Sequence, residues 1–275
     1  MKVSQLYIYP IKALGGIAIS SVNITDRGFE NDRRWMLIDE NNRFISQREI
    51  AEMSLLQVEI LQHVMKVNHK KDPANCIEIS LTPAASDITT VNIWDTLCEA
   101  QLVNTEADRW FSKILDTNCR LVYMPDSTTL KIDDQYAITG NDITSFSDGY
   151  PILMVSEESL GDLNDKLDEP LPINRFRPNL VFKGGTPFIE ESMKEFSIKD
   201  CLFYGVKPCA RCVVTTIDQD SAEKGKEPLK TLSLYRRKDA KVIFGENVIA
   251  AGTGKISIGD TITILQTKES LIKNN

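Results

Sequence analysis

The residues of this sequence that are best suited to chemistry are Cys209 and Cys212, which form a C-x-x-C pair. Such a pair serves as half of a zinc site, as a dithiol redox pair, or as one reactive thiol with a bystander. Zinc needs two more ligands, and only Cys201 lies nearby in the sequence. A thioredoxin-type pair precedes a helix, whereas the β-branched run 213–217 predicts a strand here. The basic neighbours of the pair favour the thiolate, which is the form that binds soft metals. Two interpretations therefore remain: one cysteine binds a metal whose other ligands come from a cofactor, or both cysteines are incidental thiols.

Basic residues recur in four short motifs that also contain proline, asparagine, serine or aromatic residues. These are Lys12 in 9–12, Arg33 in 31–35, Arg48 in 45–48 and Arg177 in 176–179. At strand ends such side chains are able to form an anion pocket, although most arginines in any sequence are surface charges. The spacing leaves both interpretations open. A further motif, 146–151, contains Asp148, for which the sequence favours a turn over a site carboxylate.

Composition excludes several classes of protein. The chain has 275 residues with 32 basic and 39 acidic side chains, and its net charge of −7 argues against a protein that mainly grips nucleic acid. Its 42% hydrophobic residues fit a globular protein and exclude wholesale disorder. Two histidines, His63 and His69, are too few for a multi-histidine metal site and leave almost nothing for a catalytic triad. No run of 18 apolar residues occurs, so we expect no membrane span.

The six cysteines are predicted to be reduced thiols in the cytoplasm. Pro10 and Lys12 interrupt the apolar N-terminus before any signal-like segment forms. A chain of this length is stabilised by core burial and does not need disulfides.

Short runs of β-branched, aromatic and other apolar residues predict strands that are separated by turn signals, as in a barrel or sandwich. They cover 3–8, 35–38, 43–46, 58–61, 77–81, 91–94, 180–182, 202–206, 213–217 and 242–244. Apolar spacing predicts a helix over 106–115 that is capped by Thr105. Two further helices are predicted to begin at Ser156 and at Pro228. We divide the chain near residue 120 and expect 125–142 to be a linker or a long functional loop.

An ordered set of motifs runs from Val3 to Leu265. They are 9–12, 32–33, 46–48, 147–148, 156–160, 176–180, 209–212 with 215–216, 227–232, 244–247 and 258–260. In this order they resemble the MOSC family, the molybdenum cofactor sulfurase C-terminal fold. Within it they resemble the two-part proteins that include the mitochondrial amidoxime-reducing component and bacterial YcbX. Each motif alone is weak, whereas the ordered set is specific.

The resemblance implies an α+β, mainly β fold. It implies an N-terminal β-barrel-like domain over residues 1–120 and a MOSC β-barrel with peripheral helices over 121–267, followed by a polar tail over 268–275. A molybdopterin-type molybdenum cofactor is expected between the two domains. No iron–sulfur cluster is predicted, because the chain offers no four-cysteine cluster after Leu265.

The resemblance also assigns roles to individual residues. Cys212 would supply the protein thiolate to molybdenum, with Cys209 as its neighbour in the cofactor site. Asp148 would lie near the metal, where a carboxylate manages protons or orients substrate. The residues expected to bind the cofactor's phosphate and pterin are Lys12, Arg33 and Arg177, with Asn179 nearby and Arg48 as a weaker candidate. Two positions depart from the family pattern, because Ala13 replaces a frequent serine and Gln47 replaces a usual alanine.

The activity that the resemblance implies is reduction of N-hydroxylated compounds such as hydroxylaminopurines, amidoximes and hydroxylamines. Electrons would come from a separate ferredoxin-, flavoprotein- or cytochrome b5-like protein. The alternative is a carrier of sulfur or of molybdenum cofactor that acts with a pyridoxal-phosphate-dependent sulfurase. A generic β-rich ligand-binding protein is a more distant third possibility.

Overall fold

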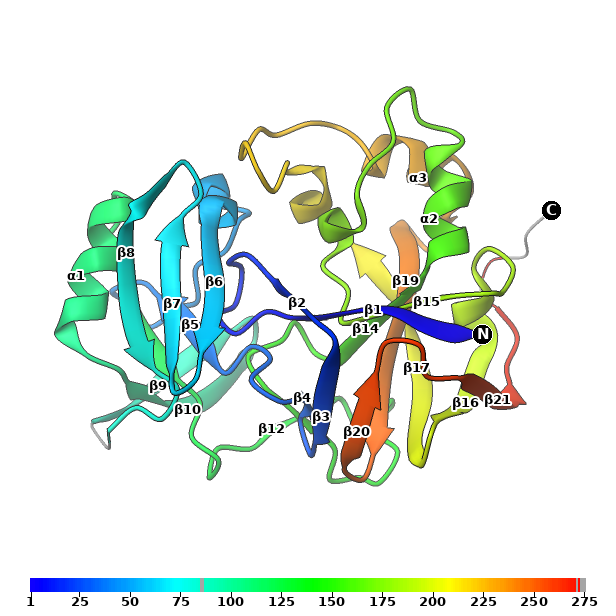
Figure 1. The fold of residues 1–275 in the computed structure, drawn as a ribbon, viewed down its shortest axis with the longest axis horizontal. Coiled ribbons are helices and arrows are strands. Elements are labelled where there is room, and N and C mark those ends of the chain that lie inside the picture. The colour runs from blue at the N-terminus through cyan, green and yellow to red at the C-terminus, as the bar shows by residue number, and fades with distance from the viewer. Residues whose placement is uncertain (85–86, 271, 273–275) are drawn as a thin grey trace.

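The computed structural model describes residues 1–84, 87–270 and 272, and these form two lobes built mainly of strands (Figure 1). One lobe is formed by residues 35–123, and the other chiefly by residues 143–267. The mainly β fold predicted from the sequence is confirmed.

The second lobe is built on the largest sheet, which has nine strands within the described residues. They are β1 (Lys2–Ile8), β2 (Ile17–Ile19), β14 (Ile152–Ser156), β15 (Leu180–Lys183), β16 (Met193–Ile198), β17 (Cys201–Arg211), β18 (Arg237–Lys238), β19 (Lys241–Ala251) and β21 (Ile262–Thr267). Their order is β2-β1-β15-β14-β19-β17-β16-β21, with β18 beside β19. The N-terminal strand β1 therefore belongs to the sheet of the second lobe, and the chain crosses between lobes before residue 35. The domain limits at residues 120 and 267 stay a prediction.

Smaller sheets complete the two lobes. The first lobe has a four-stranded sheet in the order β5 (Trp35–Ile38), β11 (Arg120–Tyr123), β10 (Thr96–Leu102), β9 (Ile88–Ile93), and a three-stranded sheet of β6 (Leu56–Leu61), β7 (Val64–His69) and β8 (Asp72–Ser80). A sheet of β4 (Gly28–Phe29), β3 (Ser21–Thr25) and β20 (Gly254–Ser257) joins early and late segments, and β12 (Leu130–Lys131) pairs with β13 (Ile143–Thr144). The predicted strand 43–46 forms only isolated bridges, at Arg43 and Phe44.

Three α-helices and four 3-10 helices lie within the described part of the chain. They are α1 (Thr105–Ile114), α2 (Glu157–Asn164), α3 (Leu229–Tyr235), η1 (Ala51–Leu55), η2 (Ile173–Phe176), η3 (Ile189–Ser192) and η4 (Val213–Thr216). The predicted cap of α2 is confirmed, since the Ser156 side chain accepts a hydrogen bond from the Ser159 amide. The predicted cap of α1 is wrong, because the Asn104 side chain accepts from the Ala107 amide. None of the helices in the described ranges is long and apolar enough to span a membrane.

The segment after Cys212 is a 3-10 helix, so the strand predicted over 213–217 is wrong. The Thr215 hydroxyl donates to the Cys212 carbonyl at 2.9 Å, and the Thr216 hydroxyl donates to the Val213 carbonyl at 2.8 Å. These bonds from side chain to backbone compete with strand pairing and stabilise a tight turn. Cys212 therefore stands at the point where β17 has ended and η4 begins.

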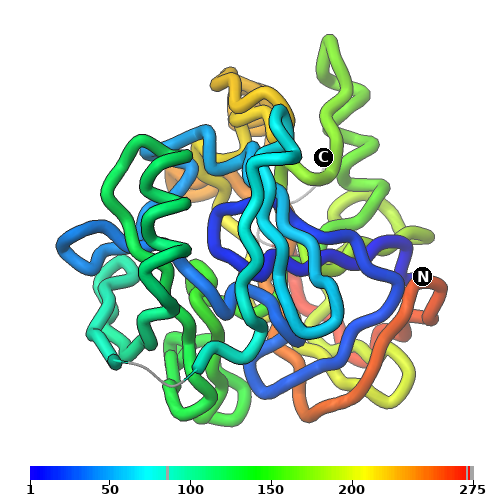
Figure 2. Tube along the Cα trace, turned by 60° about the vertical axis from the view of Figure 1, so that its left-hand side comes forward, coloured from blue at the N-terminus to red at the C-terminus, as the bar shows by residue number. Residues whose placement is uncertain are grey.

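The two lobes touch through a hairpin of the first lobe. Figure 2 shows the cyan β7–β8 hairpin reaching the gold segment that follows η4. Lys70 in its turn donates to the carbonyl of Gln219 at 2.6 Å and forms an ion pair with Asp220 at 2.9 Å. Partly exposed ion pairs contribute little to the stability of a fold. This contact therefore affects the relative orientation of the lobes more than the free energy of their association.

Candidate active site

A cavity of about 750 Å³ is lined by residues of both lobes. Its walls contain all eight residues that the sequence analysis proposed, namely Lys12, Arg33, Arg48, Asp148, Arg177, Asn179, Cys209 and Cys212. Nine lysines and arginines line it against four aspartates and glutamates, in a chain with net charge −7. The structure thus gathers the dispersed motifs at one cationic site. The role of each residue there stays a prediction.

Each cysteine of the C-x-x-C pair has its own arginine partner. Arg48 from the first lobe places Nη2 at 3.2 Å from Cys212 Sγ, and Arg211 places Nη1 at 3.0 Å from Cys209 Sγ. Each sulfur atom therefore lies within hydrogen-bonding distance of a positively charged donor. Both cysteines are only partly buried, so each sulfur is accessible from the cavity.

Asp148 lies in the loop between β13 and β14, close to Arg48, the arginine that contacts Cys212. Its carboxylate pairs with Lys12 Nζ and lies 3.6 Å from Arg48 Nη2. Lys12 is buried and also donates to the Phe146 carbonyl at 2.8 Å, which fixes the loop that carries Asp148. The Asp148 side chain is 55% exposed within the open cavity. The surrounding protein opposes its charged form, but Lys12, Arg48 and Arg33 together hold its pKa well below the usual range. Asp148 is thus a carboxylate at neutral pH.

A second part of the cavity holds two arginines against one aromatic ring. The guanidinium carbons of Arg33 and Arg177 lie 4.6 Å and 4.3 Å from the ring centroid of Tyr9. Arg33 is neutralised by Asp32 and donates to Asn179 Oδ1 at 2.9 Å. Cation–π contacts explain how two like charges are held close together.

Arg177 is the residue in this group whose charge is least compensated. Its Nη2 atom is buried with no hydrogen-bond partner within the described residues, and its Nη1 is 3.5 Å from Gln219 Oε1. Burial lowers the pKa of Arg177 to about 10. Arg33 and Arg177 also adopt the left-handed backbone region, with φ of 50° and 53°, which is uncommon outside glycine and clusters at binding sites. An orphaned guanidinium donor on a strained backbone is suited to an anionic ligand such as a phosphate.

The unusual Gln47 makes a reciprocal amide pair across the lobes. Its Nε2 donates to Gln219 Oε1 at 3.2 Å and to the Ala13 carbonyl at 2.7 Å, while Gln219 Nε2 donates back to Gln47 Oε1 at 3.0 Å. Both amides are buried. Because Gln219 also contacts Arg177, this pair helps to position the Arg177 guanidinium.

The Gln47–Gln219 pair yields a stability prediction. Gln47→Ala is expected to lower the free energy of unfolding by about 1–3 kcal/mol, because it leaves the buried Gln219 amide unsatisfied. Urea unfolding of Gln47→Ala, Gln219→Ala and the double variant measures the effect. The double variant should cost less than the sum of the single ones. Strictly additive costs would show that the two amides do not interact.

Several lining residues were not singled out by sequence reasoning. Trp94, at the turn between β9 and β10, donates from Nε1 to Asp148 Oδ1 at 3.4 Å, and its ring lies 4.6 Å from the Arg48 guanidinium. Tyr136 lies in the segment that was expected to be a linker or functional loop, and its ring is 4.1 Å from Lys207 Nζ. That prediction was the one signal that pointed to Tyr136. For Trp94 the sequence carried no signal beyond an aromatic residue at a strand end.

A buried carboxylate, Glu246, lies next to one end of the cavity. The fully buried Glu246 on β19 accepts a 2.5 Å hydrogen bond from Lys268, which itself lines the cavity. Its other oxygen has no partner within the described residues. Burial, only partly offset by Lys268, raises the pKa of Glu246 to about 8.

The raised pKa of Glu246 predicts that the free energy of unfolding depends on pH. Because the folded pKa of Glu246 lies above the unfolded value near 4.3, its protonated form stabilises the folded state, and that contribution is lost as pH rises toward 8. Relative to Glu246→Gln, the wild type should lose up to about 1.4 kcal/mol of unfolding free energy per pH unit in this window. Urea unfolding between pH 5 and 8.5 measures this, with exposed Glu78→Gln as the control. Parallel curves for wild type and Glu246→Gln would contradict the prediction.

Metal ligands are sparse in this site. Across the described ranges, histidine, cysteine, aspartate and glutamate form no group of three or more that could hold a metal ion. A metal here would have to bring most of its ligands with it. The soft thiol of Cys212 and the cationic wall around Arg177 fit a metal that is carried by an anionic, sulfur-containing cofactor.

Comparison with known proteins gives the same domain order. Residues 1–118 match the MOSC N-terminal beta barrel domain, and residues 141–263 match the MOSC domain. The chain is 30% identical to mitochondrial amidoxime reducing component 2 of Rattus norvegicus, over 94% of this chain and 82% of that protein. It is 29% identical to mitochondrial amidoxime-reducing component 1 of Mus musculus, over 96% of this chain and 82% of that protein.

A third relative is much longer. The chain is 29% identical to the molybdenum cofactor sulfurase of Oryza sativa subsp. japonica over 88% of its length, and it spans only 32% of that protein. The two domain matches together extend over most of the chain, in the order in which the two lobes follow one another. This protein therefore belongs to the MOSC family, as a member with a MOSC N-terminal β-barrel domain followed by a MOSC domain.

Proposed function

We propose that this protein is a molybdenum-cofactor-dependent reductase of N-hydroxylated compounds, such as hydroxylaminopurines, amidoximes and hydroxylamines. The observation that carries the proposal is the meeting of Cys212, Arg48 and Asp148 in a cavity that is also lined by Arg177 with its orphaned donor. In this proposal a redox site and an anion site share one cavity. Relatives over nearly the full chain are amidoxime-reducing components by name, which supports this class of substrate.

The residues present are suited to holding the cofactor. Cys212 would give the protein's sulfur ligand, and Arg48 Nη2 lies 3.2 Å from its Sγ atom. Arg177, Arg33 and Lys12 would take the phosphate and pterin, with Asn179 orienting Arg33. When bound, the cofactor supplies the two-electron redox chemistry of the proposed reaction.

The overall reaction sets what the side chains must do. Cleavage of the N–O bond consumes two electrons and two protons, and it yields the N–H compound and water. Because Asp148 is ionised at neutral pH, it is a poor proton donor and is suited to orienting an N–H group of the substrate and the cations beside it. The protons then come from solvent that enters the cavity.

The electrons would come from a separate ferredoxin-, flavoprotein- or cytochrome b5-like protein. No iron–sulfur centre is proposed in this chain. We place the protein in a reducing compartment such as the cytoplasm, because all six cysteines are free thiols.

Metal analysis together with a reduction assay tests the proposal. Protein purified from cells that make the cofactor is expected to hold about one molybdenum per chain. It should reduce benzamidoxime and 6-hydroxylaminopurine with reduced viologen as electron source. Molybdenum-loaded protein that accelerates neither reaction would refute the reductase assignment, and protein that never retains molybdenum would refute the cofactor assignment.

A second candidate is a carrier of sulfur or of cofactor that works with a pyridoxal-phosphate-dependent sulfurase. The observation that favours it is the guanidinium beside each of Cys209 and Cys212. In such a transfer a cysteine thiolate would attack the outer sulfur of a persulfide on the sulfurase, take that sulfur and release the sulfurase cysteine as a thiolate. Mass spectrometry separates the two candidates. Persulfide on either cysteine in metal-free protein supports the carrier, whereas molybdenum with turnover supports the reductase.

A further inference from the structure

Positive charge is concentrated in one exposed segment of this acidic chain. Residues 222–241 contain seven lysines and arginines against three acidic residues, and six of the seven are exposed, since Arg236 is buried and paired with Glu191; the whole chain has net charge −7. The segment includes α3 and the strand β18, and it lies at the top of the view in Figure 1. Local charge of the opposite sign to the whole molecule steers a partner toward one face.

The fold presents this charge on two rigid elements. Asp239 and Ala240 have φ of 47° and 63°, as in the two-residue turns that join tight hairpins, so the β18–β19 hairpin projects Arg237, Lys238 and Lys241 into solvent. On α3, Lys230 and the 82% exposed Leu234 are four residues apart and so share one face.

We define the basic face as the exposed cations around Leu234. They are Lys224, Lys226, Lys230, Arg237, Lys238 and Lys241. The acidic residues of this segment are Glu223, Glu227 and Asp239. Glu227 accepts from the Thr231 amide at 3.0 Å and forms a loose ion pair with Lys230 at 3.8 Å, which leaves the other five cations to dominate the face. An exposed apolar side chain within a charged rim is the usual composition of a protein interaction site.

The basic face is continuous with the candidate active site. Lys238 and Lys241 line the cavity that also contains Cys212. In the large sheet Arg211 pairs with Val242, and Val242 pairs with Arg237. Two strand spacings, about 10 Å, therefore separate the backbone of Arg237 from that of Arg211, the residue before Cys212.

We propose that the basic face docks a small acidic electron-transfer protein, which would deliver the electrons for the reduction. The inference rests on the proposed function and names the surface and the charge of the partner. Electron transfer falls steeply with distance, so a carrier must bind beside the redox site. Such encounters are small, transient and steered by charge, which fits a compact patch of cations around one apolar residue.

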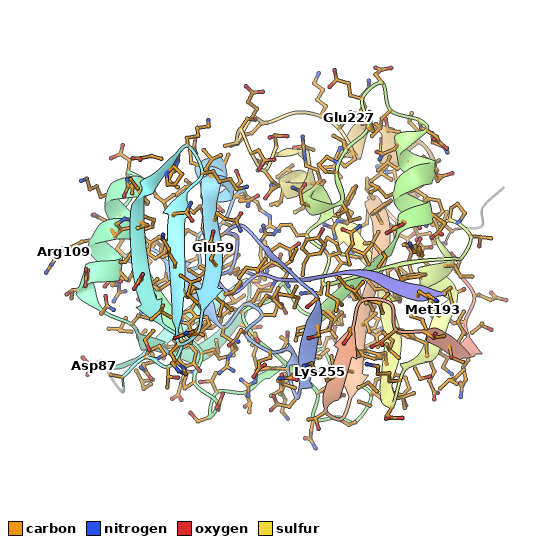
Figure 3. The ribbon with its side chains drawn as sticks, in the orientation of Figure 1. Glu59, Asp87, Arg109, Met193, Glu227 and Lys255 are labelled. Carbon is orange, nitrogen blue, oxygen red and sulfur yellow. The ribbon has the colours of Figure 1, made fainter. Side chains whose placement is uncertain are left out.

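Charge reversal tests the proposal with a matched control. The docking variant is Lys226→Glu/Lys230→Glu/Arg237→Glu, and none of these residues lines the cavity. The control, Lys113→Glu/Lys183→Glu/Lys255→Glu, changes net charge equally at exposed sites away from this face. Figure 3 shows Lys255 at the end of the molecule opposite Glu227, which marks the basic segment. Both variants are assayed with reduced viologen and with three acidic carriers, namely a [2Fe–2S] ferredoxin, a flavodoxin and a soluble cytochrome b5 domain.

The docking variant is expected to raise the KM for the carrier at least about tenfold at low salt, while viologen-driven turnover and the control stay unchanged. Added salt should raise the wild-type KM toward that of the variant. Equal effects in both triple variants, no effect, or turnover with viologen but with none of the carriers would overturn the docking proposal. A molybdenum-loaded wild-type protein that shows no turnover with reduced viologen would instead refute the proposed function.

A membrane surface is the rival occupant of a basic face with an exposed leucine. Sedimentation with phosphatidylserine vesicles measures this directly. Vesicle binding that is lost in the docking variant, together with an unchanged KM for the carriers, would overturn the proposal in favour of an anionic membrane.

Discussion

Cys212→Ala is expected to abolish both molybdenum retention and N-hydroxyl reduction. Cys212 is the predicted protein ligand, and it alone of the pair faces the inter-lobe contact with Arg48. Removing a group that only supports a ligand costs about 10–100-fold in affinity or activity, so loss of the ligand itself should exceed that range. Molybdenum content and benzamidoxime turnover with reduced viologen are the two measurements.

Substitutions of two other cysteines serve as controls for this result. Cys76 is exposed on β8 in the first lobe and does not line the cavity, so Cys76→Ala should keep both metal and turnover. Cys209→Ala should show a smaller loss than Cys212→Ala, because the Cys209 thiol contacts Arg211 on its own strand. A Cys212→Ala protein that keeps metal and activity would refute the assignment of the ligand. Equal losses at Cys209 and Cys212 would show that both sulfurs are needed.

Asp148→Asn is expected to lower kcat/KM by about 10–100-fold while the protein stays folded. The carboxylate neutralises Lys12 and Arg48, and it also accepts from Trp94. The amide would leave the buried Lys12 without its counter-charge and would free Arg48 to move away from Cys212. Steady-state kinetics with viologen, together with molybdenum content, measure the loss.

The pH profile distinguishes an orienting role of Asp148 from a proton-transfer role. Its pKa is held below the usual range of aspartate, so the group stays ionised as pH falls through 5. The profiles of wild type and Asp148→Asn between pH 5 and 8 should therefore have the same shape and differ only in height. An acid limb that is present in the wild type and absent from the variant would show that Asp148 titrates during turnover.

Sequence patterns were sufficient to predict those features that depend on interactions between neighbouring residues. The apolar periodicity of strands such as β1 and β5, the capping serine of α2 and the C-x-x-C pair depend on residues within a few positions of one another. Local reasoning failed where two local preferences competed. The β-branched residues after Cys212 favour a strand, but the hydroxyls of Thr215 and Thr216 bind nearby carbonyls and form a 3-10 turn.

The convergence of the site was decided only by the tertiary structure. The hydrogen bond from Arg48 to Cys212 joins residues 164 positions apart, and that from Lys12 to Asp148 joins residues 136 positions apart. No spacing rule relates positions so distant, because their proximity follows from strand order and from the packing of the lobes. For the same reason sequence reasoning missed Trp94 and Gln219, whose contacts with Asp148, Gln47 and Arg177 are made across the fold.

The sequence by itself determined the mainly β class, the scarcity of histidine ligands and the cysteine pair suited to a soft metal, since these follow from composition and neighbouring residues. Only the fold decided which dispersed cations meet in one cavity and which form an exposed basic face. The sequence does not distinguish a lysine or arginine on the surface from one that lies next to a thiol. The chemistry of such a side chain changes because burial and neighbouring charges change the free energy of its ionised form, and those are properties of the folded chain.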